Sequence, residues 1–228
     1  MKPLVCVPVT ARTTKEALKD IAGAKKLAGC VELRIDYLMD LSEENLEKLI
    51  KACRGKAVVT NRSRKEGGYF RESEKKRLGF LLKAVGFGAR MVDLEFSALK
   101  NSTAKKILRK KGNAKVILSY HNFKKTPARK ELKKLFERMI RVKGADILKI
   151  VTYAKNPMDT LAILGLLRLA KKAKKPSIIF AMGEKGRHTR MLSMLEGAFL
   201  GFASLSKDKA SAQGQLDAKK LSLMLKKL

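Results

Sequence analysis

The sequence predicts an α/β fold, a (β/α)8 or TIM barrel, formed by residues 1–228 as a single domain. Short β-rich runs alternate with helical segments along the whole chain, which is the pattern of a parallel sheet joined by crossover helices. Each run is almost continuously apolar, as in strands that are covered on both faces. The 228 residues provide about 28 for each β/α unit, which is enough for a barrel. An open, doubly wound sheet is the alternative.

The expected strands follow one another at regular intervals. They comprise residues 4–9, 30–36, 57–61, 91–95, 115–120, 147–151, 177–181 and 199–203. Between them, apolar residues recur at helical spacing, as from Leu132 to Ile140. Ser42 and Pro127 are typical of helix starts, and glycines such as Gly55 precede the next strand. We therefore expect one helix after each strand.

The composition argues against several classes of protein. No apolar run approaches the roughly 18 residues of a membrane span, and residues 1–10 are too short for a secretory signal, so we expect a cytoplasmic protein. The three cysteines lack Cys-x-x-Cys spacing and are expected to be reduced thiols. Neither of the two histidines has further ligands at the spacing of a zinc site, so we expect no metal.

The chain is strongly basic, with 52 Lys and Arg against 21 Asp and Glu and a net charge of +31. Such an excess can bind nucleic acid by neutralising phosphates. The lysine pairs, however, are spread over nearly every expected helix rather than gathered into one stripe. We therefore expect a solvated basic surface that attracts small anionic substrates, and no specific nucleic-acid partner.

Reactive groups of (β/α)8 barrels lie at the carboxyl ends of the strands, and charged and polar residues gather there in this sequence. They are Glu32, Arg34, Arg62, Asp93, Glu95, His121, Lys149 and Ser204. Lys149 stands inside an otherwise apolar strand. Burial disfavours the charged form of an amine and favours its attack on a carbonyl group. Alternatively, this lysine extends out of the barrel or pairs with a carboxylate.

The other candidates also have two interpretations each. His121 directly follows a strand. Either it moves protons near neutral pH, or it only forms hydrogen bonds that hold its loop. His188 is expected at the surface. Glu32 and Arg34 share a strand face and enter the barrel mouth or form a structural ion pair with each other. Glu66 orients His121 or lies in a solvated loop.

Two glycine-containing loops follow the last strands, where barrels place anion-binding segments. They comprise residues 183–186 and 211–215. Neither matches a nucleotide-binding fingerprint, and glycine-containing loops are more often simple turns.

Taken together, these motifs resemble the type I 3-dehydroquinate dehydratase family along almost the whole chain. The matching elements are Glu32-Leu33-Arg34, Thr60-Asn61-Arg62, Glu66-Gly67-Gly68, Ser119-Tyr120-His121-Asn122-Phe123, Lys149-Ile150, Met182-Gly183 with Gly186 and Arg190, and Ser211 with Gln215. Their order at successive strand ends makes the resemblance specific. Asn122 replaces the family's usual Asp and Gln213 its usual Pro, which affects how two loops are held but removes no reacting group.

The resemblance implies a cofactor-free lyase of the shikimate pathway that converts 3-dehydroquinate to 3-dehydroshikimate. Lys149 would form an imine with the substrate ketone, and His121 would move protons, with Glu66 orienting the imidazole. The resemblance also assigns substrate binding: carboxylate to Arg190 and Ser211, ring hydroxyls to Glu32, Arg34, Arg62 and Gln215, and packing on the ring to Met182. It further implies a homodimer, without identifying the interface.

Two other functions are compatible with parts of the sequence. A class I aldolase barrel also places a Schiff-base lysine late in the strand order, but it would usually act on a phosphorylated substrate. The His121 motif and the Glu-x-Arg pair favour dehydration instead. A basic nucleic-acid-binding protein without catalysis is the second alternative, and the chain lacks a recognisable binding module.

Overall fold

The computed structural model describes residues 3–206, 209 and 215–226. Its strands are β1 (Leu4–Val9), β2 (Cys30–Arg34), β3 (Ala57–Thr60), β4 (Met91–Glu95), β5 (Lys115–His121), β6 (Ile147–Tyr153), β7 (Ser177–Met182) and β8 (Leu200–Phe202). Its α-helices are α1 (Thr14–Leu27), α2 (Glu43–Ala52), α3 (Glu74–Gly86), α4 (Ser102–Arg109), α5 (Arg129–Ile140), α6 (Pro157–Lys172), α7 (His188–Leu195) and α8 (Ala218–Lys226).

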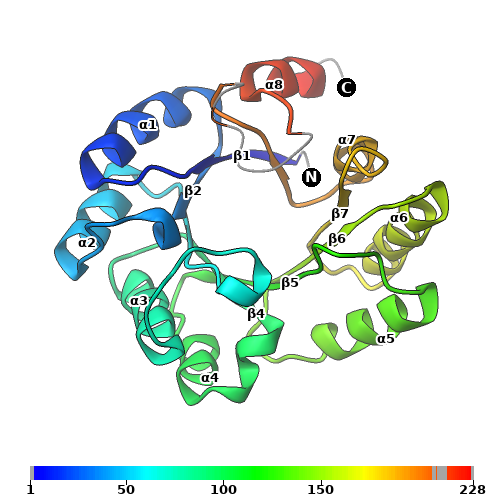
Figure 1. Ribbon diagram of the computed structural model, residues 1–228, viewed down its shortest axis with the longest axis horizontal. Coiled ribbons are helices and arrows are strands. Elements are labelled where there is room, and N and C mark those ends of the chain that lie inside the picture. Colours follow the sequence, from blue (N-terminus) through cyan, green and yellow to red (C-terminus); the bar gives the residue numbers. More distant parts are fainter. Residues whose placement is uncertain (1–2, 207–208, 210–214, 227–228) are drawn as a thin grey trace.

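The strands form one parallel sheet in the order β7-β6-β5-β4-β3-β2-β1-β8. At its open edge the backbone N–H of Phe199 donates to the carbonyl of Ser177 at 2.8 Å, so β8 lies beside β7 and the barrel is nearly closed. Figure 1 shows the strands at the centre with the helices around them. The predicted (β/α)8 barrel is therefore confirmed, and the open sheet is not formed.

The helix starts follow from local capping. Ser42 accepts a hydrogen bond from the backbone of Asn45 at the start of α2, as the sequence predicts. Asn156 forms a capping box with Asp159 ahead of Pro157, the first residue of α6. Pro127 lies just before α5 rather than in its first turn, because the helix begins at Arg129.

Six of the eight strands begin or end one or two residues away from the predicted bounds, and two of these differences affect the site. The second strand stops at Arg34 because the chain turns into a short 3-10 helix, Ile35–Tyr37, in which Asp36 accepts hydrogen bonds from the Arg34 side chain. The fifth strand extends to His121, which pairs in register with Val151 of β6. His121 is thus the last residue of a strand rather than part of the following loop.

The barrel interior begins with a layer of apolar side chains, to which every strand contributes one. This apolar layer consists of Cys6, Cys30, Val58, Met91, Ile117, Ile147, Ile178 and Leu200. All eight side chains are buried, with at most 2% exposure. Alternate residues of a strand face the same side, so the next inward-facing positions lie two residues farther along each strand.

Those positions form a second layer that is polar on five consecutive strands. This polar layer consists of Glu32, Thr60, Asp93, Ser119 and Lys149. All five residues are at most 5% exposed. Phe180 and Phe202 occupy the corresponding positions of β7 and β8. On each of these five strands the inward-facing side chains therefore change from apolar to polar within two residues, toward the carboxyl end.

Helices α1 to α8 cover the outer faces of the strands with two further apolar clusters, one against β1 to β5 and one against β5 to β7. Over the described residues, no helix is long and apolar enough to cross a membrane.

Candidate active site

A cavity of about 340 Å³ opens at the carboxyl ends of the strands, directly above the polar layer. Its walls carry Glu32, Arg34, Tyr37, Arg62, Glu66, Gly67, Tyr69, His121, Phe123, Lys149, Val151, Phe180, Met182, Arg190, Phe202 and Gln215. Every site residue predicted from the sequence is in this wall except Ser211, which lies outside the described residues. The barrel thus brings together residues that are up to 183 positions apart, from Glu32 to Gln215.

Lys149 lies in the floor of the cavity, at the middle of β6. Its Nζ donates to Asp93 Oδ2 at 2.9 Å and lies 3.8 Å from Glu32 Oε1. The ring centroid of Phe202 is 4.5 Å from the same nitrogen. The lysine is therefore paired with a carboxylate, as one interpretation of the sequence held, yet its amine also faces the cavity.

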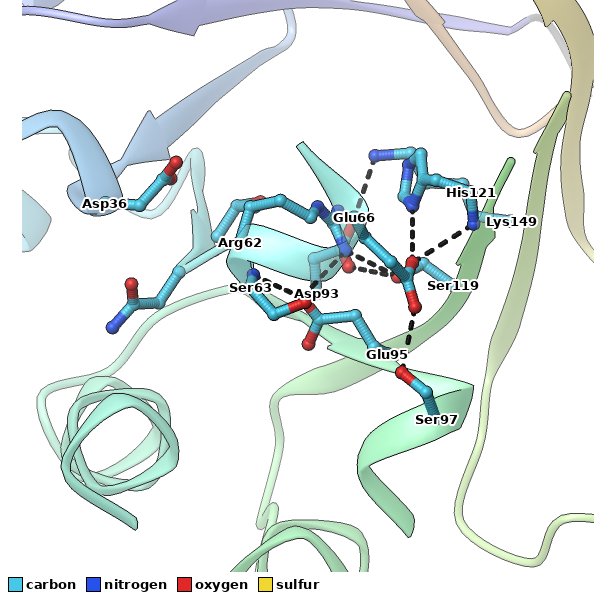
Figure 2. A network of polar contacts seen from close by, with 12 residues as sticks. Asp36, Arg62, Ser63, Glu66, Asp93, Glu95, Ser97, Ser119, His121 and Lys149 are labelled. Atoms are coloured by element: carbon cyan, nitrogen blue, oxygen red, sulfur yellow. Dashed lines mark hydrogen bonds and ion pairs between the residues drawn. The ribbon is translucent and has the colours of Figure 1, made fainter. Parts of the chain in front are cut away.

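Asp93 is shared between two cations. Arg62 Nη2 lies 2.7 Å from Asp93 Oδ2, the same oxygen that Lys149 contacts, and the hydroxyl of Ser119 donates to Asp93 Oδ1 at 2.6 Å. Figure 2 shows these side chains converging between the ends of β3 and β6. Burial alone would raise the pKa of Asp93, but Arg62 and Lys149 outweigh it and lower that pKa well below its usual range.

Arg62 also reaches a second carboxylate. Its Nη1 donates to Ser119 Oγ at 2.9 Å and lies 3.2 Å from Glu95 Oε1. Burial opposes the charged guanidinium, but Asp93 and Glu95 outweigh it and raise the pKa of Arg62. Arg62 is therefore a fixed cation in the cavity wall.

His121 and Glu66 form a second pair at the cavity wall. Nδ1 of His121 lies 3.0 Å from Glu66 Oε2, and the backbone N–H of His121 donates to the same oxygen at 3.1 Å. Ser97 donates to the other oxygen of Glu66 at 2.8 Å. The structure thus contains the Glu66–His121 contact that one interpretation of the sequence predicts. An ionised Glu66 fixes the tautomer with hydrogen on Nδ1, which leaves Nε2 free to accept a proton.

The electrostatic environment keeps the imidazole neutral. Burial, together with the positive charges of Arg62 and Lys149, holds the pKa of His121 well below its usual value. Burial also raises the pKa of Glu66 to about 7, although Arg62 opposes this change. A neutral histidine near an ionisable carboxyl group is suited to general base catalysis.

The ion-pair partner of Arg34 differs from one expectation from the sequence. The structural ion pair considered between Glu32 and Arg34 is not formed; Arg34 instead makes two hydrogen bonds to Asp36, at 2.9 and 2.8 Å. Glu32 accepts a hydrogen bond from Thr60 at 2.8 Å and lies near Lys149. The two residues face the same cavity but hold different partners, because Asp36 lies in the turn that directly follows Arg34.

The opposite wall of the cavity is more apolar. The Arg190 guanidinium lies over the Phe180 ring, 4.3 Å from its centroid, and burial lowers the pKa of Arg190 to about 10. Met182 and Gln215 complete this side. A partly buried guanidinium beside apolar surfaces is suited to bind the carboxylate of a small ring compound.

Local features hold the loops that follow β3 and β5. A Cβ atom at Gly68 would lie 1.8 Å from the carbonyl oxygen of Arg62, so only glycine fits there. Asn122, where the resembled family has Asp, accepts hydrogen bonds from the backbone of Lys124 and Lys125, each at 3.0 Å. The amide oxygen therefore holds the histidine loop as a carboxylate oxygen would. Gln213, the other departure, lies outside the described residues.

The sequence predicted no specific role for five further residues that lie at the same level of the barrel as Lys149: Asp93, Ser119, Thr60, Phe180 and Phe202. A simple pattern marks them: each lies two residues after an apolar-layer residue of its own strand, as Lys149 does. In the described part of the chain, no group of three or more His, Cys, Asp or Glu side chains is arranged to hold a metal ion. The described side chains instead supply an amine, a base and several cations.

Comparison with known proteins identifies the family. A sequence model described as "Type I 3-dehydroquinase" matches residues 5–228. The 3-dehydroquinate dehydratase of Methanococcus maripaludis strain C7 is 37% identical over 224 residues, which cover 98% of this chain and 99% of that protein. That of Methanocaldococcus jannaschii is 36% identical over 216 residues, or 94% of each chain.

Solved structures agree with this assignment. The 3-dehydroquinate dehydratase from Aquifex aeolicus superposes with a TM-score of 0.81 at 26% identity, covering 99% of this chain and 98% of that one. The protein of the same name from Geobacillus kaustophilus reaches a TM-score of 0.89 at 24% identity, covering 100% and 91%, and supports the fold. On the sequence matches above, this chain belongs to the type I 3-dehydroquinase family of enzymes.

Proposed function

We propose that this protein is a 3-dehydroquinate dehydratase of the shikimate pathway, a hydro-lyase that eliminates water through a Schiff base on Lys149. The observation that carries the proposal is the juxtaposition of one buried amine, Lys149, with one neutral histidine, His121, in the same 340 Å³ cavity. Family membership and the names of the curated relatives support the substrate.

In the proposed first step, the Nζ atom of Lys149 attacks the ketone carbon and water leaves, forming an imine. A protonated imine withdraws electrons from the adjacent carbon and makes its proton acidic. Asp93, at 2.9 Å from Nζ, is positioned to stabilise the positive charge of the protonated imine. Phe202 and the apolar layer below exclude water from that side of the amine.

In the second step, Nε2 of His121 removes the proton from the ring carbon next to the imine. The electrons move into the imine, the carbon–oxygen bond to the neighbouring hydroxyl breaks, and His121 returns the proton to the departing hydroxyl as water forms. Glu66 holds Nδ1 at 3.0 Å and so keeps Nε2 directed at the substrate. Hydrolysis of the imine releases the product and restores Lys149.

The remaining side chains of the wall bind the substrate in this proposal. Arg190 takes the substrate carboxylate, with Ser211 as its partner, and Met182 packs on the ring. Glu32, Arg34, Arg62 and Gln215 position the ring hydroxyls. The basic character of the whole chain, at +31, favours the arrival of an anion. The homodimer and the cytoplasmic location stay predictions.

The test is a turnover assay with purified protein and 3-dehydroquinate, following the absorbance of the conjugated product. We expect saturable dehydration, and no cleavage of sugar phosphates under the same conditions. Cleavage of a phosphorylated sugar without dehydration of 3-dehydroquinate would favour the aldolase chemistry instead.

A further inference from the structure

Helix α3 carries a buried arginine that the proposed reaction does not use. Arg77 points from the outer side of the barrel toward the end of β4 and is 2% exposed. Its Nη1 lies 2.8 Å from Glu95 Oε2 and also donates to the carbonyl of Asn61. Its other two nitrogens, Nε and Nη2, donate to the half-exposed carboxylate of Glu74, each at 2.7 Å.

Glu95 is held by two arginines, one on each oxygen. Arg77 contacts Oε2, and Arg62 lies 3.2 Å from Oε1, which also accepts the backbone N–H of Ser63 at 2.9 Å. Arg62 in turn shares Asp93 Oδ2 with Lys149. Charges therefore alternate from the helix to the cavity: Arg77, Glu95, Arg62, Asp93, Lys149. Figure 2 shows the inner part of this series, with Asp93 and Glu95 both beside the Arg62 side chain.

Helix α3 is also attached to the barrel by apolar residues other than Arg77. Leu78, Leu81 and Ala84 already pack the helix against the core, and each is fully buried. Burying a guanidinium costs desolvation free energy, so an ion pair is a poor substitute for apolar contact in holding a helix. The desolvation cost of burying Arg77 is therefore better explained by a role in the charged network than by attachment of the helix.

We infer that Arg77 is a positioning residue that sets, through Glu95, Arg62 and Asp93, how readily the Lys149 amine loses its proton. The inference rests on the proposed function, because it assigns Lys149 as the nucleophile. Arg77 neutralises Glu95, which leaves Arg62 free to bind Asp93 firmly. Asp93 divided between two cations stabilises the lysine ammonium less than Asp93 held by Lys149 alone.

Other charged groups face Lys149 from each neighbouring element and remain in place in the test below. They are Glu32 and Arg34 on β2, Arg62 after β3, Asp93 on β4, His121 on β5 and the buried thiol of Cys6 on β1. Glu66 faces Arg62 and His121 from the turn after β3. None of these groups is substituted in the test, and Glu95 also raises the pKa of Glu66, so only shifts of opposite sign in the two variants report the charges of Arg77 and Glu95.

The experiment uses two substitutions that remove opposite charges from the buried pair. Arg77→Met and Glu95→Gln are each incubated with 3-dehydroquinate and a hydride reductant over a pH series, and the adduct is quantified by intact-protein mass spectrometry. Arg77→Met should move the midpoint for adduct formation to higher pH by about half to one unit, and Glu95→Gln should move it to lower pH by a similar amount. Either variant alone tests the sign if the other does not fold.

Lys83→Met is the matched control, since it removes one positive charge from the same helix. Lys83 is half-exposed and pairs with the exposed Glu43 rather than with the buried series. The pH midpoint for adduct formation in Lys83→Met should equal that of the parent protein. Equal midpoints for Arg77→Met and Lys83→Met, or shifts of the same sign for Arg77→Met and Glu95→Gln, would overturn the inference. Absence of any adduct in the parent would instead remove the proposed function, and this inference with it.

Discussion

The apolar layer and the polar layer of the barrel lie two residues apart on the same strands, yet they obey different energetics. Both are almost fully buried. Ile117 and Ile147 gain free energy by leaving water, whereas Ser119 and Lys149, the next inward-facing residues of the same strands, lose hydration when buried. The polar layer persists because each charge has a partner, as Asp93 has in Lys149 and Arg62.

The difference shows how one barrel separates stability from chemistry. The lower layer requires only volume and apolarity, so its side chains are exchangeable in principle. The upper layer requires particular groups at particular atoms, because one missing partner leaves an unpaired buried charge. Substitutions in the two layers are therefore expected to affect different measurable quantities.

The largest effect on turnover is expected from Lys149→Met. Methionine fills a similar volume but offers no amine, and Asp93 keeps Arg62 as a partner, so the fold should survive. We expect turnover to fall by about four orders of magnitude or more, as for the loss of other covalent nucleophiles. Steady-state assays and circular dichroism measure the two quantities. Turnover within about tenfold of the parent would exclude Lys149 as the nucleophile.

A smaller loss is expected from His121→Ala. Lys149 is still able to form the imine, but the group that moves protons is missing, so turnover should drop by about 10²-fold or more while some adduct remains. The measurement pairs steady-state rates with mass spectrometry of the reduced adduct. A variant that turns over normally, or one that loses turnover and adduct equally, would contradict the separate roles of the two residues.

Glu66→Gln should lower kcat/KM by about tenfold at high pH and should change how kcat/KM depends on pH. In the parent, kcat/KM is expected to fall as the pH drops below about 7, because a protonated Glu66, with its pKa raised to about 7, no longer accepts from Nδ1–H of His121. Glutamine does not titrate, so this decline should flatten in the variant. An unchanged pH profile would show that Glu66 is not the titrating group.

The same ionisation has a consequence for stability. Because the folded state raises the pKa of Glu66 from 4.5 to about 7, it favours the protonated form, and the associated stabilisation is complete below pH 4.5 and lost as the pH rises through 7. The melting temperature of the parent should therefore decline relative to Glu66→Gln over that interval. A parallel course of the two curves would contradict the raised pKa.

The smallest effect on turnover is expected in the apolar layer. Ile117→Ala removes buried methyl groups below the cavity and should cost about 2–5 kcal/mol of unfolding free energy. The kcat of the folded protein should stay close to that of the parent. Ser119→Ala, two residues along the same strand, is the matched comparison: it should lower kcat, because it removes a hydrogen bond to Asp93 and one from Arg62. Identical profiles for the two variants would remove the distinction between the layers.

Much of this architecture follows from the sequence, because strand periodicity and strand-end position are local properties. The apolar runs predict all eight strands, and polar residues at their ends predict one shared mouth. The partners were harder to predict. Arg34 pairs with Asp36 rather than Glu32 because a 3-10 turn follows β2, and the contact between Asp93 and Lys149 joins residues 56 positions apart.

Arg77 illustrates the remaining limit most clearly. On a helix that carries lysines at neighbouring positions, its guanidinium resembles one more solvated cation. Only the crossing of α3 over the end of β4 brings it to Glu95 and buries it. Such contacts depend on how elements pack, which local sequence patterns do not encode.

The most direct test of the account is to locate the covalent intermediate. Protein incubated with 3-dehydroquinate and then reduced with borohydride should carry a single adduct, which peptide mass spectrometry maps to Lys149, since this amine faces the cavity in which the substrate is proposed to bind. Lys149→Met should carry none. An adduct on any other lysine, or an active parent protein that yields no adduct, would contradict the assignment of Lys149 as the nucleophile.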